Sequence, residues 1–231
     1  MERVVEPEWL DELPASDSRA SRSRRDLRRI NALMGNASLV AASLRRVKGA
    51  GEMHHLVELG AGDGSFALSL ARRLSSVDQL REVTLVDQAA FANGNAQGEF
   101  AKLDVALNVI QADVFDWLAG AGAVDAIVAN LFLHHFEEER LQKLLRLAAS
   151  RSRVFITCEP RRSSMSLVGS RLLGLIGCND VTRHDAVVSV RAGFSGRELS
   201  RLWPEHREWV LEERPAGVFS HLFVARRVAS P

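Results

Sequence analysis

A glycine-rich loop constrains the fold of this chain more than any other feature of its sequence. Residues 57–66 read VELGAGDGSF, so Gly60, Gly62 and Gly64 alternate with other residues directly after an apolar run. The following residues place Phe66, Leu70 and Leu74 on one face of a predicted helix. Glycines let a backbone turn sharply and approach a ligand without a Cβ in the way. The run therefore predicts a strand, a ligand-binding loop and a helix.

Short apolar runs and amphipathic stretches alternate after this loop. We predict strands at 55–59, 82–86, 106–110, 124–129 and 154–158, and helices at 65–75, 89–103, 114–120 and 137–149. Such alternation is typical of a doubly wound parallel sheet. A helix at 195–203 and strands at 208–213 and 219–226 follow, and the turn at 215–217 is too short for a parallel crossover. We expect an α/β fold with a mostly parallel seven-stranded sheet, a C-terminal antiparallel hairpin and helices on both faces.

The first 50 residues differ in composition from the rest. Residues 1–17 carry six acids, and residues 19–29 carry six arginines on a predicted amphipathic helix, which a second short helix follows. We interpret 1–50 as a helical cap or lid and 51–231 as a Rossmann-like domain, with a cap insertion at about 160–194. Three interpretations of these arginines stay open. They form a solvated face paired with the preceding acids, or they form a lid over the pocket. Alternatively, they contact an anionic substrate, a carrier-protein phosphopantetheine or RNA.

The amino-acid composition limits the classes of partner and the cellular compartment that we expect for this chain. The net charge of +1 supplies no broad basic surface, which argues against a nucleic acid. Cys158 and Cys178 have neither zinc-binding nor disulfide spacing, so we predict no metal site and a reducing compartment. The N-terminus lacks a signal-peptide pattern, and no apolar run approaches the roughly 20 residues of a membrane span, so we expect a cytoplasmic protein. A homodimer stays open.

Acidic residues mark the ends of the first three predicted strands. Glu58 precedes the glycines, whose G-x-G-x-G spacing differs from the G-x-G-x-x-G of nicotinamide dinucleotide sites. A carboxylate there repels a pyrophosphate and suits an ammonium group. Asp87 ends the second strand and can accept hydrogen bonds from ribose hydroxyls, and Asp113 ends the third. Ligands of open α/β sheets bind at this edge.

The loop and these acids resemble motif I and the following motifs of class I (Rossmann-like) S-adenosylmethionine (SAM) dependent methyltransferases. The likeness covers roughly residues 50–227. It implies SAM as cofactor and S-adenosylhomocysteine (SAH) as product, with an acid at the position of Asp113 reading the adenine amino group. The cofactor-binding residues that it predicts are Glu58, Gly60, Ala61, Gly62, Gly64, Asp87, Gln88, Asp113, Val114, Asn130 and Leu131.

Histidines supply the candidate catalytic groups. Residues 130–132 do not match the Asn/Asp-Pro-Pro-aromatic run of methyltransferases that act on nucleic-acid bases, whereas 133–136 (LHHF) is similar to small-molecule methyltransferases. In aromatic O-methyltransferases a histidine at the position of His134 removes the acceptor's proton, and His135 is the alternative base. His184 beside Asp185 predicts either a second base or a structural hydrogen-bonded cluster.

These features favour methyl transfer to a small-molecule acceptor, with O-methylation of a phenol or enol hydroxyl as the leading hypothesis. C-methylation of a small aromatic or quinone-like acceptor is the near alternative. A non-catalytic SAM-binding protein and an RNA or protein methyltransferase are the further alternatives. The glycine spacing disfavours a nicotinamide oxidoreductase.

Overall fold

A seven-stranded sheet forms the centre of the molecule. The computed structural model describes residues 1–14, 16–47, 53–74, 80–89, 95–204 and 206–228. Its strands are β1 His55–Leu59, β2 Glu82–Asp87, β3 Ala106–Gln111, β4 Val124–Asn130, β5 Ser152–Pro160, β6 Trp209–Ala216 and β7 Ser220–Arg227. They lie in the order β3-β2-β1-β4-β5-β7-β6, and β7 is antiparallel to both β5 and β6. The predicted sheet and its C-terminal hairpin are confirmed.

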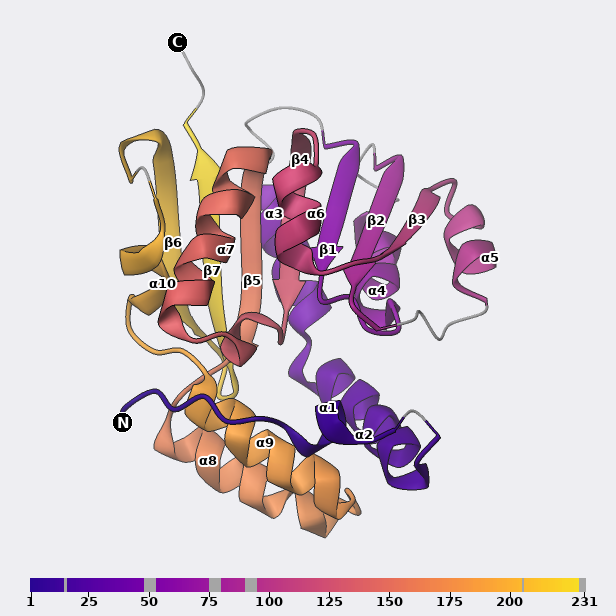
Figure 1. Cartoon of the computed structure of the whole chain (residues 1–231), viewed down its shortest axis with the longest axis vertical. Helices are drawn as coiled ribbons and strands as arrows, with labels where there is room; N and C mark the ends of the chain where they lie inside the picture. The colour runs from indigo at the N-terminus through magenta and orange to yellow at the C-terminus, as the bar shows by residue number, and fades with distance from the viewer. Residues whose placement is uncertain (15, 48–52, 75–79, 90–94, 205, 229–231) are drawn as a thin grey trace.

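Helices cover both faces of the sheet (Figure 1). One face carries α3 Asn36–Val47, α4 Ser65–Leu74 and α5 Ala96–Ala101; the other carries α6 Val114–Gly120, α7 Glu138–Arg151 and α10 Glu198–Leu202. The central strands are apolar in their middle, at 126–129 in β4 and 154–156 in β5, because both faces of a parallel sheet are covered there. In α7 the buried side chains recur every three or four residues, which turns one helical stripe toward the sheet.

A cap of helices lies beyond the carboxyl ends of the parallel strands (Figure 1). It contains α1 Trp9–Glu12, α2 Ser18–Met34, α8 Ser164–Arg171, the short 3-10 helix η3 Leu172–Ile176 and α9 Asp180–Ala192. Asp17 caps the start of α2 and Gly35, with φ of 67°, ends it. The cap is therefore built from two segments far apart in sequence.

Two expectations need correction. The predicted N-terminal cap extended to residue 50, but α3 packs against α4 and the sheet, with Val40 and Leu44 buried in the core; the cap segment ends at Gly35. The continuous helix α9 was not predicted either, because Arg183, His184 and Asp185 interrupt its apolar pattern.

The other helices differ from the predicted ones in where they begin and end. The helix expected at 89–103 is described as α5, and residues 90–94 of that prediction lie outside the described residues. The helix expected at 195–203 is the shorter α10, and single 3-10 turns occur at η2 Leu133–His135 and η4 His206–Glu208. Among the described residues, no helix combines the length and apolar character needed to cross a bilayer.

Candidate cofactor and catalytic site

The glycine loop between β1 and α4 has the backbone that its sequence predicts. Gly60, Gly62 and Gly64 have φ of 67°, 54° and 70°, a left-handed conformation that other residues adopt only with strain. A Cβ on Gly60 would lie 2.1 Å from the ring of Phe132, which follows β4. A Cβ on Gly62 would meet no heavy atom of the described residues within 4 Å. The loop thus packs against β4 at Gly60 and faces open space at Gly62.

Hydrogen bonds join this loop to the end of β2. The backbone N–H groups of Gly60 and Ala61 donate to the carbonyl of Val86, at 2.9 and 3.2 Å. The N–H of Gly62 donates to one carboxylate oxygen of Asp87 at 2.7 Å, and the N–H of Ala89 donates to the other at 2.8 Å. Asp87 therefore lies directly beside the open part of the loop.

The end of β3 continues this row of polar groups. The side-chain amide of Gln88 donates to Asp113 at 2.5 Å. The other oxygen of Asp113 accepts the N–H of Phe115 at 2.7 Å and so caps α6, whose first residue, Val114, is buried. A carboxylate oxygen can accept more than one hydrogen bond, so these contacts leave Asp113 with capacity for a ligand. The structure brings together the predicted cofactor residues of β1, β2 and β3.

Glu58 differs from the prediction made for it. Its side chain is buried and accepts the N–H of Ala67 at 3.1 Å, at the start of α4. Burial raises the pKa of Glu58 well above its ordinary value, more than this hydrogen bond lowers it. Glu58 therefore links β1 to the start of α4, and its burial disfavours the charged carboxylate that the prediction assumed.

At the end of β4 the two predicted cofactor residues are held by long-range contacts. The side-chain oxygen of Asn130 accepts from Asn36 at 2.8 Å, and Asn36 in turn accepts from Ser220 at 2.8 Å, a buried chain that joins β4, α3 and β7. Leu131 has φ of 52°, although it is not glycine. Such strain persists where the surrounding structure enforces it, and it is often found beside functional sites.

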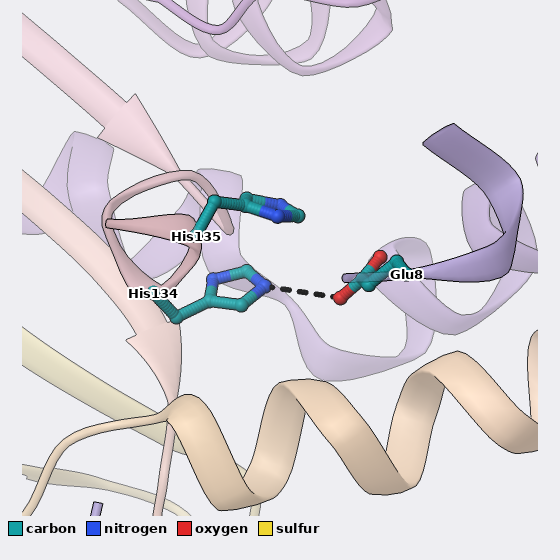
Figure 2. A group of neighbouring side chains, drawn as sticks. All are labelled: Glu8, His134 and His135. Carbon is teal, nitrogen blue, oxygen red and sulfur yellow. Dashed lines mark ion pairs between the residues drawn. The ribbon is translucent and has the colours of Figure 1, made fainter. Parts of the chain in front are cut away.

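The buried carboxylate of Glu159 at the end of β5 holds the turn that carries the histidines. It accepts the N–H groups of Phe132 and Leu133 at 3.2 and 3.0 Å, and Nδ1 of His134 lies 2.8 Å from it. On the other side of the ring, Nε2 of His134 lies 3.4 Å from Glu8 (Figure 2). His134 is thus clamped between two carboxylates.

This clamp sets the charge of His134. Burial alone lowers the pKa of this imidazole, but the hydrogen bonds and negative charges of Glu159 and Glu8 outweigh burial and raise it to about 9. At neutral pH both ring nitrogens of His134 therefore carry protons. An imidazolium has no free lone pair, which favours His135 over His134 as the general base.

His135 has the opposite character. Burial and the positive charge of His134 lower the pKa of His135 to about 4, so its ring is neutral at physiological pH. The two rings lie with centroids 4.2 Å apart (Figure 2), and Nδ1 of His135 lies 3.7 Å from a carboxylate oxygen of Asp11. The pair consists of one charged donor and one neutral ring that can accept a proton.

The N-terminal segment also contacts this site. Arg3 donates to the carbonyls of His134 and Phe136, at 3.2 and 2.8 Å, and to the carbonyl of Ala192 in α9. Glu8 also accepts from Ser189 of α9. Arg3, Glu8 and Glu159 were not among the predicted site residues, because nothing local in the sequence shows that these distant residues meet at η2.

His184 lies in a different environment. Its ring stacks on Trp9 with centroids 3.8 Å apart, and its Nδ1 lies 2.9 Å from Asp185. Asp185 also accepts the N–H groups of Trp9 and Leu10, at 2.9 and 3.0 Å. These contacts fasten α1 to α9, which favours the structural interpretation over a second base. His184 faces an open hollow whose lining residues are Trp9, Arg171, Asp180, Arg183, His184 and Val187.

Glu8, His134 and His135 also have the ligand types of a metal site. One donor atom from each lies within 4.8 Å of the others. Nε2 of His134 lies 3.4 Å from Glu8, so an ion pair between Glu8 and the protonated ring accounts for the geometry. This cluster was not predicted, because Glu8 is remote in sequence from the histidine pair.

Comparisons with known proteins agree on one class. Residues 56–153 match the family model described as a methyltransferase domain. No curated protein sequence matches the chain. Among solved structures, the plantazolicin methyltransferase BpumL in complex with SAH has a TM-score of 0.68 at 14% identity, covering 92% of each chain. Magnesium protoporphyrin IX methyltransferase from Synechocystis PCC 6803, also with SAH, has a TM-score of 0.53 at 13% identity, covering 95% of this chain and 91% of that one.

An O-methyltransferase family protein from Burkholderia thailandensis has a TM-score of 0.62 at 16% identity and matches 94% of this chain. The chain spans 62% of the length of that protein. The methyltransferase-domain match over residues 56–153 and the fold shared with methyltransferases that hold SAH agree with the sequence resemblance to class I SAM-dependent methyltransferases. The cofactor of this class is SAM.

Proposed function

We propose that this chain methylates the hydroxyl group of a small phenol or enol, with His135 as the proton acceptor and His134 as a charged positioning residue. The observation that carries the proposal is the clamped histidine pair at the end of β4, directly beside the glycine loop. The two parts of the site lie together because Phe132, one residue before η2, packs on Gly60.

The described residues fit the cofactor. The open loop at Gly62 lets a ligand approach the backbone, and Asp87 and Asp113 present carboxylates along the adjoining strand ends. We assign the ribose hydroxyls to Asp87 and the adenine amino group to Asp113. The bound cofactor supplies an electrophilic methyl group on a sulfonium.

The two histidines divide the work of preparing the acceptor. A neutral His135 accepts a hydrogen bond from the acceptor's hydroxyl and takes its proton as the oxygen becomes a nucleophile. The cation at His134 keeps this neighbouring ring neutral, and Glu159 and Glu8 hold it in place. Because Asp11 lies near Nδ1 of His135, it stabilises the ring once that ring is protonated.

The low basicity of His135 also bears on the acceptor. A base with a pKa of about 4 removes a proton efficiently only from a group that is itself acidic. This favours phenols with electron-withdrawing substituents and enols conjugated to a carbonyl over aliphatic alcohols. The same enols are nucleophilic at carbon, so C-methylation is the second candidate.

The test is methyl transfer from SAM to a panel of phenols, enols and quinones, followed by mass spectrometry, with the product's methyl carbon assigned by NMR. We expect His135→Ala to lower kcat about a hundredfold or more with little change in KM, whereas the control His206→Ala, an exposed histidine of η4, retains it. An unchanged kcat in His135→Ala excludes His135 as the proton acceptor. If none of the acceptors in the panel is methylated, the proposed reaction is contradicted.

We further propose that the Glu8–His134–His135 cluster works with a proton and no metal ion. Incubation with a chelator followed by gel filtration tests this. Full activity is the expected result, and loss of activity that Mn²⁺ or Zn²⁺ restores is the result that overturns it.

A further inference from the structure

We infer that the outer face of α8 and η3 is a docking surface for an anionic lipid bilayer. Five large apolar side chains are exposed along this segment: Met165, Val168, Leu172, Leu175 and Ile176. Their spacing of three or four residues places them on one side of the helix. Leu175 is 82% exposed and Met165 66% exposed, values far from those of a core residue.

The tip of the β6–β7 hairpin enlarges this face. Phe219 is 45% exposed, and its ring lies so close to Gly169 of α8 that a Cβ there would meet it at 2.4 Å. Ser166 of α8 also donates to the carbonyl of Val218, a second exposed apolar residue. We call these seven residues the apolar face; contiguous apolar surface of this kind marks an interaction site.

Arginines border the apolar face on several sides. Arg171 lies exposed in the last turn of α8, and Arg161 donates to the carbonyl of Gly217 at the hairpin tip. Arg22 of the arginine-rich helix α2 donates to the carbonyl of Gly177 just after η3. No aspartate or glutamate occurs between residues 161 and 179. An amphipathic helix with a basic rim is suited to lie in the interface of an anionic membrane.

The arginines also decide between a bilayer and a second copy of the chain. A two-fold dimer pairs the same patch with itself, so Arg171 and its neighbours would face their equivalents. Like charges brought together in this way repel, whereas phosphate headgroups neutralise them. Figure 1 shows α8 at the outer end of the cap and α2 at the same end, so both can meet one surface.

The test is flotation of the full chain with vesicles of phosphatidylcholine alone or of equal parts phosphatidylcholine and phosphatidylglycerol. We expect the wild type to float with the anionic vesicles and less so in high salt. The double variant Leu172→Ser, Leu175→Ser should lower the vesicle-bound fraction about tenfold or more, and Arg171→Glu should lower it as well.

The matched controls carry equivalent changes elsewhere. Val109→Ser with Val210→Ser removes two exposed valines of the edge strands β3 and β6, and Arg201→Glu reverses a charge on α10; both should float like the wild type. Circular dichroism checks that every variant folds. A wild type that stays unbound, or a double variant that floats unchanged, overturns the inference. So does a dimer in sedimentation velocity that the double variant abolishes while vesicle binding is absent.

Discussion

The cofactor half and the acceptor half of the site are built in different ways. The cofactor half consists of the loop after β1 and the ends of β2 and β3, and its contacts join residues within one or two strand–helix units. The acceptor half joins η2, the end of β5, α9 and the N-terminal segment, and its key ion pairs run from Glu8 to His134 to Glu159. Local sequence segments therefore form the cofactor half, whereas long-range packing forms the acceptor half.

The comparison predicts that stability depends more on the acceptor half, where Glu159 is fully buried. Glu159→Ala removes the nearer of the two carboxylate partners of His134 and leaves two backbone N–H groups without their acceptor. We expect a loss of about 3–5 kcal/mol in the free energy of unfolding, measured by urea denaturation. Glu8→Ala removes the more distant partner of His134, at 3.4 Å, and should cost less. Equal losses of unfolding free energy in Glu159→Ala and Glu8→Ala would show that the burial of Glu159 does not account for its contribution to stability.

The charge of His134 predicts a dependence of stability on pH. Its folded pKa of about 9 exceeds the ordinary value of 6.5, so its stabilising contribution is complete below pH 6.5 and is lost as the pH rises through 9. Between these limits the wild type should lose about 1–3 kcal/mol relative to His134→Gln. Urea denaturation at a series of pH values measures this, with His206→Gln as control. Parallel curves for wild type and His134→Gln would contradict the ion-pair assignment.

The glycines predict a graded loss of cofactor affinity. Gly60→Ala strains a left-handed backbone and also displaces Phe132, whereas Gly62→Ala adds strain alone. A left-handed non-glycine residue costs about 1–2 kcal/mol, which is roughly a tenfold loss of SAH affinity for Gly62→Ala. Gly60→Ala should lose more SAH affinity than Gly62→Ala. Calorimetric titration with SAH compares them, and a larger loss in Gly62→Ala would reverse our interpretation of the loop.

The smallest effect is expected where α2 meets the loop. Arg28 forms an exposed ion pair with Asp63 at 3.1 Å. Exposed pairs of this kind contribute about 0–1 kcal/mol, so Arg28→Ala should change the thermal midpoint little and SAH affinity less than threefold, roughly. A large loss of affinity would mean that α2 acts as a lid on the cofactor, the alternative that its sequence left open.

The sequence could place the residues of the proposed cofactor half side by side because each of its signals is local. The glycine loop, Asp87 and Asp113 each follow a strand, and parallel strands end at one edge of a sheet. Their side-chain neighbours were therefore predictable, although the ionisation of Glu58 was not, because burial determines it.

The acceptor half was predictable only in outline. The histidine pair stood out, yet which ring is charged depends on Glu8 and Glu159, which pack against it from opposite sides. The helix α9 was missed for a related reason, since the contact of Asp185 with the backbone of α1 explains polar residues that otherwise read as a break in the pattern.

One calorimetric titration with SAH tests the separation of the two halves most directly, comparing the wild type, Asp87→Ala and His135→Ala. The account predicts micromolar binding by the wild type, loss of binding in Asp87→Ala, and wild-type affinity in His135→Ala even though this variant no longer transfers methyl groups. Wild-type affinity in Asp87→Ala, or loss of affinity in His135→Ala, would contradict it.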